Sequence, residues 1–355
     1  MSLLRLPPET LAQIFDYIGS SFFHEDLGRL AVCKQWFEFA LPACFKCVTI
    51  SQEILRSLIT SEAMRKPSPL KRSLETLDLE LRGCHYPYSS TAGPQDNAQE
   101  SDVLNRPASN EALDGVLIKT WINVLNEDLA QLAIIAQQSH RLRTLRIRAR
   151  SSSSPDSLDD PEDYLSLRTV QGFLSVENLS VLVLDLSICP FNPSGEQGGD
   201  LHICPTIGSL LHTLRTLHLR MHSICPDVLK PQVPDDNLKL SVMVINLSLI
   251  TNEPGITSAA HSKRCGSPAG GLLQLKADIQ EQAEALTARM TSPKIMRVLT
   301  HSLPQFEIQS LDVLTGKIMM LEDDMAWDED GKMVMEESEP ESEFPDDEFS
   351  SFSDD

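Results

Sequence analysis

The side chains that could do chemistry are few in this sequence, and their spacing is loose. Cys44 and Cys47 form its one close cysteine pair. A tetrahedral zinc site needs a second pair of ligands at a suitable distance along the chain, and no such pair is nearby. Because both cysteines flank Phe45 in an apolar stretch, we expect buried structural thiols.

Three other residues could act as ligands: His218, His222 and Cys225. If Leu217 and Leu219 face a core, the alternation of a strand turns His218 outward. His222 lies beyond the end of the same strand. We therefore expect ordinary surface histidines and no metal site.

No segment has the pattern of a nucleotide-binding or catalytic motif. The glycine-rich loop at 195–199 follows a predicted strand, which is where a phosphate-binding loop would lie. It lacks the G-x-G-x-x-G order, and no Gly-Lys-Ser/Thr follows it. G-x-S-x-G and H-E-x-x-H do not occur. The sequence predicts no catalytic residue and no cofactor, and an enzyme is not expected.

The negative charge is concentrated at one end of the chain. The formal net charge is -21, and residues 321–355 hold 16 acidic residues against the single Lys332, which leaves -6 for the rest. Binding to phosphate backbones needs clustered Lys and Arg, so we expect no nucleic acid partner. The apolar runs are a fraction of a membrane span, so we expect no membrane partner either.

The eight cysteines are scattered and form no disulfide framework. Glu9 and Asp16 interrupt the first apolar residues, where a signal peptide would need a continuous apolar run. A cytoplasmic or nuclear location is expected.

A dense helical pattern covers residues 6–48. Pro7 and Pro8 suit the first turn of a helix, and Gly19 offers a stop. A second helix is predicted from Asp26 and is limited by Pro42. The first helix carries apolar residues at i, i+3, i+4 and i+7, which are Leu11, Ile14, Phe15 and Ile18.

Beyond this module, an L-x-x-L-x-[L/I] pattern starts at Leu74, Leu142, Leu179 and Leu214, and each copy predicts a short strand. The spacings of 68, 37 and 35 residues are longer and less regular than those of a leucine-rich repeat. An irregular leucine-rich-repeat-like α/β array is expected, and an open α/β sheet would show the same alternation. Helices are predicted at 111–138, 164–175, 205–212 and 272–299, with a last strand around 306–314.

The fold class is therefore α+β or α/β, with five parts along the chain. A helical module at 1–50 precedes a connector with the first strand at 51–84 and a flexible loop at 85–110. The α/β region spans 111–320, and an acidic disordered tail spans 321–355, either regulatory or merely solubilising. Further flexible loops are expected at 151–162, 190–200 and 252–271.

Four groups of residues follow one another at specific spacings in the N-terminal module: Leu6-Pro7-Pro8-Glu9, Leu11 with Ile14 and Phe15, Asp26-Leu27-x-x-Leu30, and Val32-Cys33-Lys34-x-Trp36. This pattern, over about residues 3–48, resembles an F-box of the fungal type. The resemblance implies a compact helical unit that binds the Skp adaptor of cullin-based ubiquitin ligases. The residues that it assigns to this binding module are Leu6, Pro7, Leu11, Ile14, Phe15, Leu27, Leu30, Val32, Cys33 and Trp36.

The sequence does not divide these residues between the partner and the module's own core, and a helical cap on the array is the alternative. The leucine array looks like the substrate-binding region of leucine-rich F-box proteins. The resemblance thus implies a non-catalytic substrate-recognition subunit of a Skp–cullin–F-box ligase, which binds the Skp adaptor, through it cullin, and an unknown target protein. The alternative is an F-box/leucine-rich interaction protein that acts outside a ubiquitin ligase.

Overall fold

The computed structural model describes residues 5–60, 69–83, 109–150, 164–189, 202–233, 237–249, 261–266, 271–302, 307–322 and 325–333. Most of the expected flexible loops, the glycine-rich loop at 195–199 and residues 334–355 of the expected tail lie outside these ranges. In the described part of the chain, no helix is both long enough and apolar enough to span a membrane.

The N-terminal module contains α1 (Pro8–Ile18), α2 (Ser20–Glu25), the 3-10 helix η2 (Leu27–Leu30) and α3 (Lys34–Cys44). The first predicted helix is confirmed, and it ends at Gly19, whose φ of 81° suits glycine. The single second helix is wrong, because Cys33 has extended backbone and its sulfur accepts the N–H of Trp36 to cap α3.

Pro42 does not end α3 but lies inside its last turn. A proline there removes only one backbone hydrogen bond, near the end of the helix. The helix therefore runs on to Cys44, where β1 follows closely.

Among the described residues, ten strands form one sheet, whose order follows the chain. The first seven strands pair in parallel, and the last three are antiparallel. No reversal of strand order occurs of the kind that marks a doubly wound sheet. The strands are β1 (Cys47–Ser51), β2 (Thr76–Arg82), β3 (Thr144–Arg150), β4 (Val181–Leu186), β5 (Thr216–Met221), β7 (Val242–Asn246), β9 (Ile295–Ser302), β10 (Glu307–Asp312), β11 (Ile318–Leu321) and β12 (Lys332–Met333).

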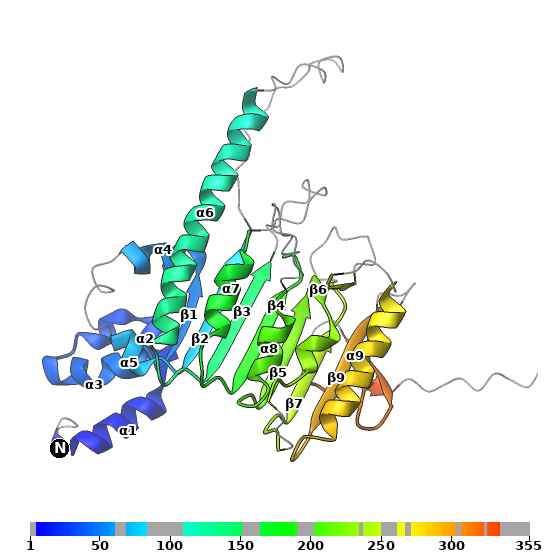
Figure 1. The fold of residues 1–355 in the computed structure, drawn as a ribbon. Helices are drawn as coiled ribbons and strands as arrows, with labels where there is room; N and C mark the ends of the chain where they lie inside the picture. The colour runs from blue at the N-terminus through cyan, green and yellow to red at the C-terminus, as the bar shows by residue number, and fades with distance from the viewer. Residues whose placement is uncertain are drawn as a thin grey trace, which may run out of the picture.

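The helices of the α/β region cover one face of this sheet, where α6, α7, α8 and α9 lie in front of the strands (Figure 1). Helix α6 continues well beyond the edge of the sheet (Figure 1). Two short parallel strands, β6 (Ser223–Ile224) and β8 (Lys263–Arg264), form a second sheet of their own. The helices are α4 (Gln52–Thr60), α5 (Pro69–Ser73), α6 (Ser109–Gln137), α7 (Leu167–Leu174), α8 (Cys204–Leu210) and α9 (Gly271–Thr287), with the 3-10 helix η4 (Pro226–Leu229).

The predicted helices at 111–138, 164–175 and 205–212 correspond to α6, α7 and α8. The helix predicted at 272–299 ends early, and its last residues belong to β9. Pro293 disfavours helical backbone before it, and the following apolar run fits a buried strand as well as a helix. Burial on both faces hides the alternation that marked the earlier strands.

The four leucine patterns form β2, β3, β4 and β5 as predicted, and a repeated backbone arrangement explains their register. Two consecutive N–H groups, of Glu75 and Thr76, donate to the carbonyl of Lys46 at 2.8 and 3.0 Å. The same double donation recurs at the start of each later parallel strand, onto the carbonyls of Glu75, Arg143, Ser180, Arg215 and Ser241. The first leucine of each pattern is buried just before this turn, and the other two face the helices.

The main core is continuous between sheet and helices from Ile50 to Val298. The N-terminal module has its own core around Phe15 and Phe23. A third apolar cluster, around Val244, lies on the opposite face of the sheet and includes Trp327. Part of the segment expected to be a disordered tail is therefore ordered: Met325 and Trp327 pack against this cluster, and β12 pairs with β11.

Candidate functional site

Part of the predicted partner-binding set forms the core of the N-terminal module. Leu11 and Phe15 are fully buried, and Leu30 is nearly so. The ring of Phe15 meets the edge of Trp36 with centroids 4.6 Å apart. The indole N–H of Trp36 donates to the carbonyl of Arg29 at 2.6 Å. Trp36 therefore holds η2 against α1.

The rest of the predicted set faces outward. Leu27 and Val32 are 63% and 64% exposed, and Leu6 is 38% exposed. Pro7 and Cys33 are exposed as well. Ile14 is half-buried, as Trp36 is. The structure thus divides the predicted set into residues that support the fold and residues that face solvent, a division that the sequence left open. The second set, called here the exposed apolar group, consists of Leu6, Pro7, Leu27, Val32 and Cys33.

The exposed apolar group lies on a rigid base. Asp26 caps η2 by accepting the N–H of Gly28 at 2.8 Å, and the guanidinium of Arg29 lies 4.2 Å from the ring of Phe22. Leu27 follows this cap directly, and Val32 lies in the turn before Cys33 starts α3. Both apolar side chains are therefore held on short, capped backbone.

Lys46 joins the module to the array. Its ammonium group lies 3.2 Å from the carboxylate of Asp16 on α1 and 3.6 Å from that of Glu75, beside β2. Its carbonyl accepts the two N–H groups that start β2. The module therefore packs directly against the first strands.

The face of the sheet away from the helices carries two rows of outward side chains. The strand register aligns Glu80, Arg148, Asp185 and Arg220 across β2, β3, β4 and β5. The charge alternates in sign along this row. In the neighbouring row, Asp78 is aligned with Arg146 in the same way.

These charges pair with one another. Arg148 lies 3.3 Å from a carboxylate oxygen of Asp78 and 3.3 Å from one of Glu80. Arg146 lies 3.9 Å from Asp78. Burial raises the pKa of Asp78, although both arginines act in the opposite direction. The side chains of Arg146, Arg148 and Glu80 remain a third to a half exposed, so this face presents paired charges to solvent.

Residues 325–333, called here the C-terminal segment, cover the other half of this face. Trp327 packs with the cluster of Val244 and Leu299, and its ring lies 4.9 Å from the Arg220 guanidinium. Arg297 pairs with Asp330 and donates to the carbonyl of Glu329. Among the described residues, this segment extends over the outward side chains of β5, β7 and β9, called here the covered half, and not over those of β2, β3 and β4, called here the open half.

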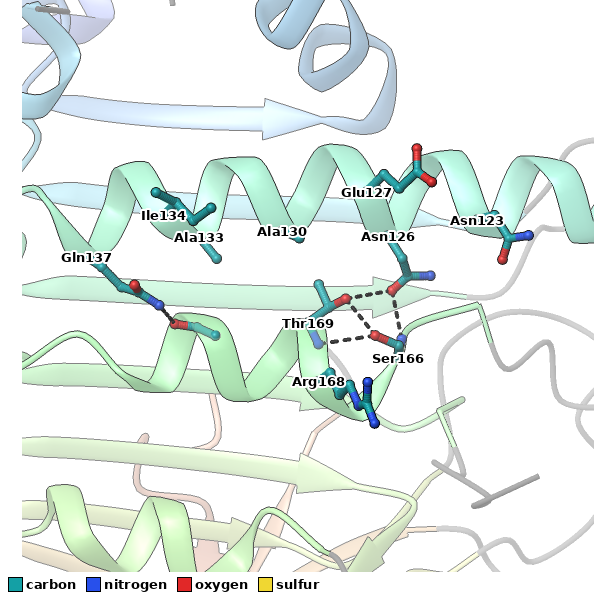
Figure 2. A pocket seen from close by; sticks show the side chains of 11 residues that line it. Asn123, Asn126, Glu127, Ala130, Ala133, Ile134, Gln137, Ser166, Arg168 and Thr169 are labelled. Carbon is teal, nitrogen blue, oxygen red and sulfur yellow. Dashed lines mark hydrogen bonds between the residues drawn. The ribbon is translucent and has the colours of Figure 1, made fainter. Parts of the chain in front are cut away.

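A groove of about 480 Å³ lies between α6 and α7 (Figure 2). The amide oxygen of Asn126 accepts the N–H of Ser166 and the hydroxyl of Thr169, both at 2.8 Å (Figure 2). Gln137 donates to the carbonyl of Gly172 at 2.7 Å. These polar side chains bond to the helices themselves, so the network fixes α6 against α7 and offers no catalytic arrangement.

The remaining predicted residues are distributed as follows. Cys44 is buried in the core of the module, and burial raises the pKa of its thiol. Cys47 is exposed, so the expectation of a buried thiol was right for Cys44 and wrong for Cys47. His218 does turn away from the helices, but Asp328 of the C-terminal segment lies 3.9 Å from it.

Sequence reasoning missed one group of side chains. His202, Cys204, Cys225 and Cys265 converge beside the β6–β8 pair. The four side chains come from three distant chain segments without a short motif, so no spacing rule reveals them. Of the four, Cys225 was considered as a ligand on sequence grounds, beside His218 and His222, and no metal site was expected there. The His-x-Cys pair at 202–204 was a further local signal.

No protein-family model matches the chain, and no curated protein matches it.

Proposed function

We propose that this protein is a substrate-recognition subunit of a Skp–cullin–F-box ubiquitin ligase. In this proposal the N-terminal module binds the Skp adaptor, and the open half of the sheet binds a target protein. The observation that carries it is the exposed apolar group of the module, because apolar side chains grouped at the surface, unlike single scattered ones, mark protein-binding sites.

The exposed group belongs to the F-box-like pattern itself. Leu27 and Val32 are both about two-thirds exposed within one short stretch, while their neighbours Leu30 and Trp36 support the fold. A module that needed only to cap the array would gain stability by burying these side chains. Their exposure supports a partner that covers them.

The open half of the sheet supports the second role. It is a polar face of the parallel sheet. Its paired arginines and carboxylates can leave one another and pair with charges of a target segment. Arg146 and Arg148 are 39% and 32% exposed, which leaves them accessible on one side. Such charges favour specificity and rapid association more than affinity.

The test of the first role is binding of the purified full-length protein to the Skp adaptor. Combined Leu27→Asp and Val32→Asp should weaken binding more than tenfold, since residues at the centre of an interface contribute about 2 kcal/mol or more. Leu273→Asp on α9 is the matched control, because Leu273 is 83% exposed at the other end of the array. Unchanged binding by the double variant, with its fold intact, would refute the proposal.

The second role is tested in cells in which the ligase is inactivated so that targets accumulate. Proximity labelling should identify proteins that depend on the open half. Combined Arg146→Glu and Arg148→Glu should remove them while cullin and the Skp adaptor remain labelled. Labelling of the adaptor without cullin would instead indicate an interaction protein that acts outside a ligase.

A further inference from the structure

Three cysteines and one histidine meet at the edge of the sheet where β4, β5 and β7 end. His202 and Cys204 lie at the start of α8, Cys225 follows β6, and Cys265 follows β8. Their ligand atoms all lie within 4.8 Å of one another. Cys204 and Cys225 are buried, and the other two are half-buried. Four metal-binding side chains therefore point at one place from three segments.

The distances fit a tetrahedral ion. The sulfurs of Cys204 and Cys265 are 3.7 Å apart, and the sulfur of Cys225 is 3.7 Å from Nδ1 of His202. Zinc–sulfur bonds of about 2.3 Å at tetrahedral angles place two sulfurs about 3.8 Å apart. A disulfide would need the sulfurs of Cys204 and Cys265 at about 2.05 Å.

The ligand chemistry narrows the choice of metal. Three thiolates and one imidazole favour a borderline-soft ion over magnesium or calcium, which prefer oxygen. The compact grouping suits one ion, because a cluster of two or more irons would separate the sulfurs that bind opposite metals. Four protein ligands also fill the coordination shell of zinc, which is typical of a structural site and leaves no position for a reacting water.

The side chains around the four residues carry charges of both signs. One zinc with three thiolates carries a net negative charge, and Lys230 and Arg264 border the same pocket as three of the ligands. Lys230 lies 2.8 Å from Asp227, beside Cys225. Arg264 pairs with Asp278, so both cations already have a carboxylate partner.

We infer that His202, Cys204, Cys225 and Cys265 form a structural zinc site. The ion would bind the start of α8 to the ends of β6 and β8, and so fix three loops that leave the same edge of the sheet. The backbone already brings these segments together, since the N–H of Cys265 donates to the carbonyl of Ile224 at 3.3 Å. This inference is independent of the proposed ligase function.

The test uses the full-length protein, expressed with added zinc and purified under reducing conditions without chelator. Elemental analysis should find about one zinc per chain, as a four-ligand site requires. Cobalt exchanged into the protein should show the absorption of tetrahedral cobalt with thiolate ligands. Absence of both signals from the folded protein, or a disulfide between Cys204 and Cys265 found by peptide mapping, would overturn the inference.

Variants locate the ion. Cys225→Ser and Cys265→Ser should each lose most of the bound zinc and the cobalt absorption, whereas His202→Cys should retain both. Cys189→Ser is the matched control, because Cys189 is buried like Cys204 but lies outside the group. Equal zinc in Cys225→Ser and in the control would contradict the assignment.

Thiol protection tests the site without any substitution. In the native protein, Cys204, Cys225 and Cys265 should react slowly with an alkylating reagent, and a chelator should expose them together. Exposed Cys33 and Cys47 should react at the same rate with and without chelator. Protection that does not respond to the chelator would contradict a bound ion.

Discussion

Arg220 on β5 holds Asp185 on β4 through two parallel contacts, with Nε 2.7 Å from Oδ1 and Nη2 2.6 Å from Oδ2. The two side chains are only 13% and 9% exposed. Trp327 of the C-terminal segment lies on the guanidinium. The pair therefore lies at the border between the open and the covered half of the sheet, and it links the two.

The first prediction concerns this pair. Arg220→Leu should lower the free energy of unfolding by about 3 kcal/mol, because it leaves a buried carboxylate without its partner. Combined Asp185→Leu and Arg220→Leu should cost less than the single variant, since no charge is then left unpaired. Urea unfolding of the variants measures both losses. Additive losses in the double variant would show that the two side chains act independently.

Local sequence patterns predicted much of the fold. The leucine patterns at Leu74, Leu142, Leu179 and Leu214 predicted four strands, because alternate leucines or isoleucines face the core in each of them. β7 and β9 were missed since the C-terminal segment covers their second face, and Val244 and Leu299 are buried there. An apolar run without alternation fits a helix as well as a strand. Burial of both faces of these strands thus removed the alternation of apolar and polar residues by which a strand is predicted.

The candidate sites also differ in whether a local sequence pattern predicts them. The residues expected to bind the adaptor were chosen from an F-box-like pattern that is contiguous in sequence, although only the structure separates exposed Leu27 from buried Phe15. The Cys and His group was missed because its members come from three segments. The rows of charge on the sheet depend on how neighbouring strands are aligned, and the sequence of one strand does not show this alignment. Each missed feature is a property of neighbouring strands rather than of one segment.

The second prediction separates two roles of Trp36. Trp36→Phe keeps an aromatic ring against Phe15 but removes the donor to the Arg29 carbonyl, so it should cost about 1 kcal/mol of unfolding free energy. Trp36→Ala also removes the ring and should cost about 3 kcal/mol or more. Thermal and urea unfolding measure the difference. Equal losses would mean that the ring contributes nothing beyond the hydrogen bond.

The third prediction concerns the close approach of α8 to η4. A Cβ atom on Gly208 would lie 2.6 Å from the carbonyl oxygens of Asp227 and Lys230. Gly208→Ala should therefore destabilise the protein by about 2 kcal/mol, because rigid backbone must move. It should also weaken zinc binding, since α8 carries Cys204.

Gly115→Ala in α6 is the matched control for this substitution. A Cβ there would meet no atom within 4 Å, and alanine favours helix over glycine by about 1 kcal/mol. This variant should be as stable as the wild type or more so. Thermal unfolding compares the two. If Gly208→Ala unfolded at the same temperature as the wild type, α8 and η4 would not approach each other as closely as the structure shows.

The fourth prediction is a loss of stability in acid that originates at His301. Its ring stacks on that of His261 with centroids 3.5 Å apart, and its Nδ1 lies 3.0 Å from the hydroxyl of Ser248. Burial and, as the smaller cause, the neighbouring His261 together lower the pKa of His301 from 6.5 to about 4. The folded protein therefore keeps this ring neutral at pH values where the unfolded chain protonates it.

Between about pH 6.5 and pH 4 the unfolded state binds more protons at this position than the folded state, so the free energy of unfolding falls as the pH falls. Each pKa unit corresponds to about 1.4 kcal/mol, which limits this contribution to about 3 kcal/mol. Urea unfolding across this pH range should show a shallower decline for His301→Gln than for the wild type. Glutamine does not titrate and can still bond Ser248, so the difference between the two curves isolates the ring. Parallel curves would mean that His301 is protonated equally easily in both states.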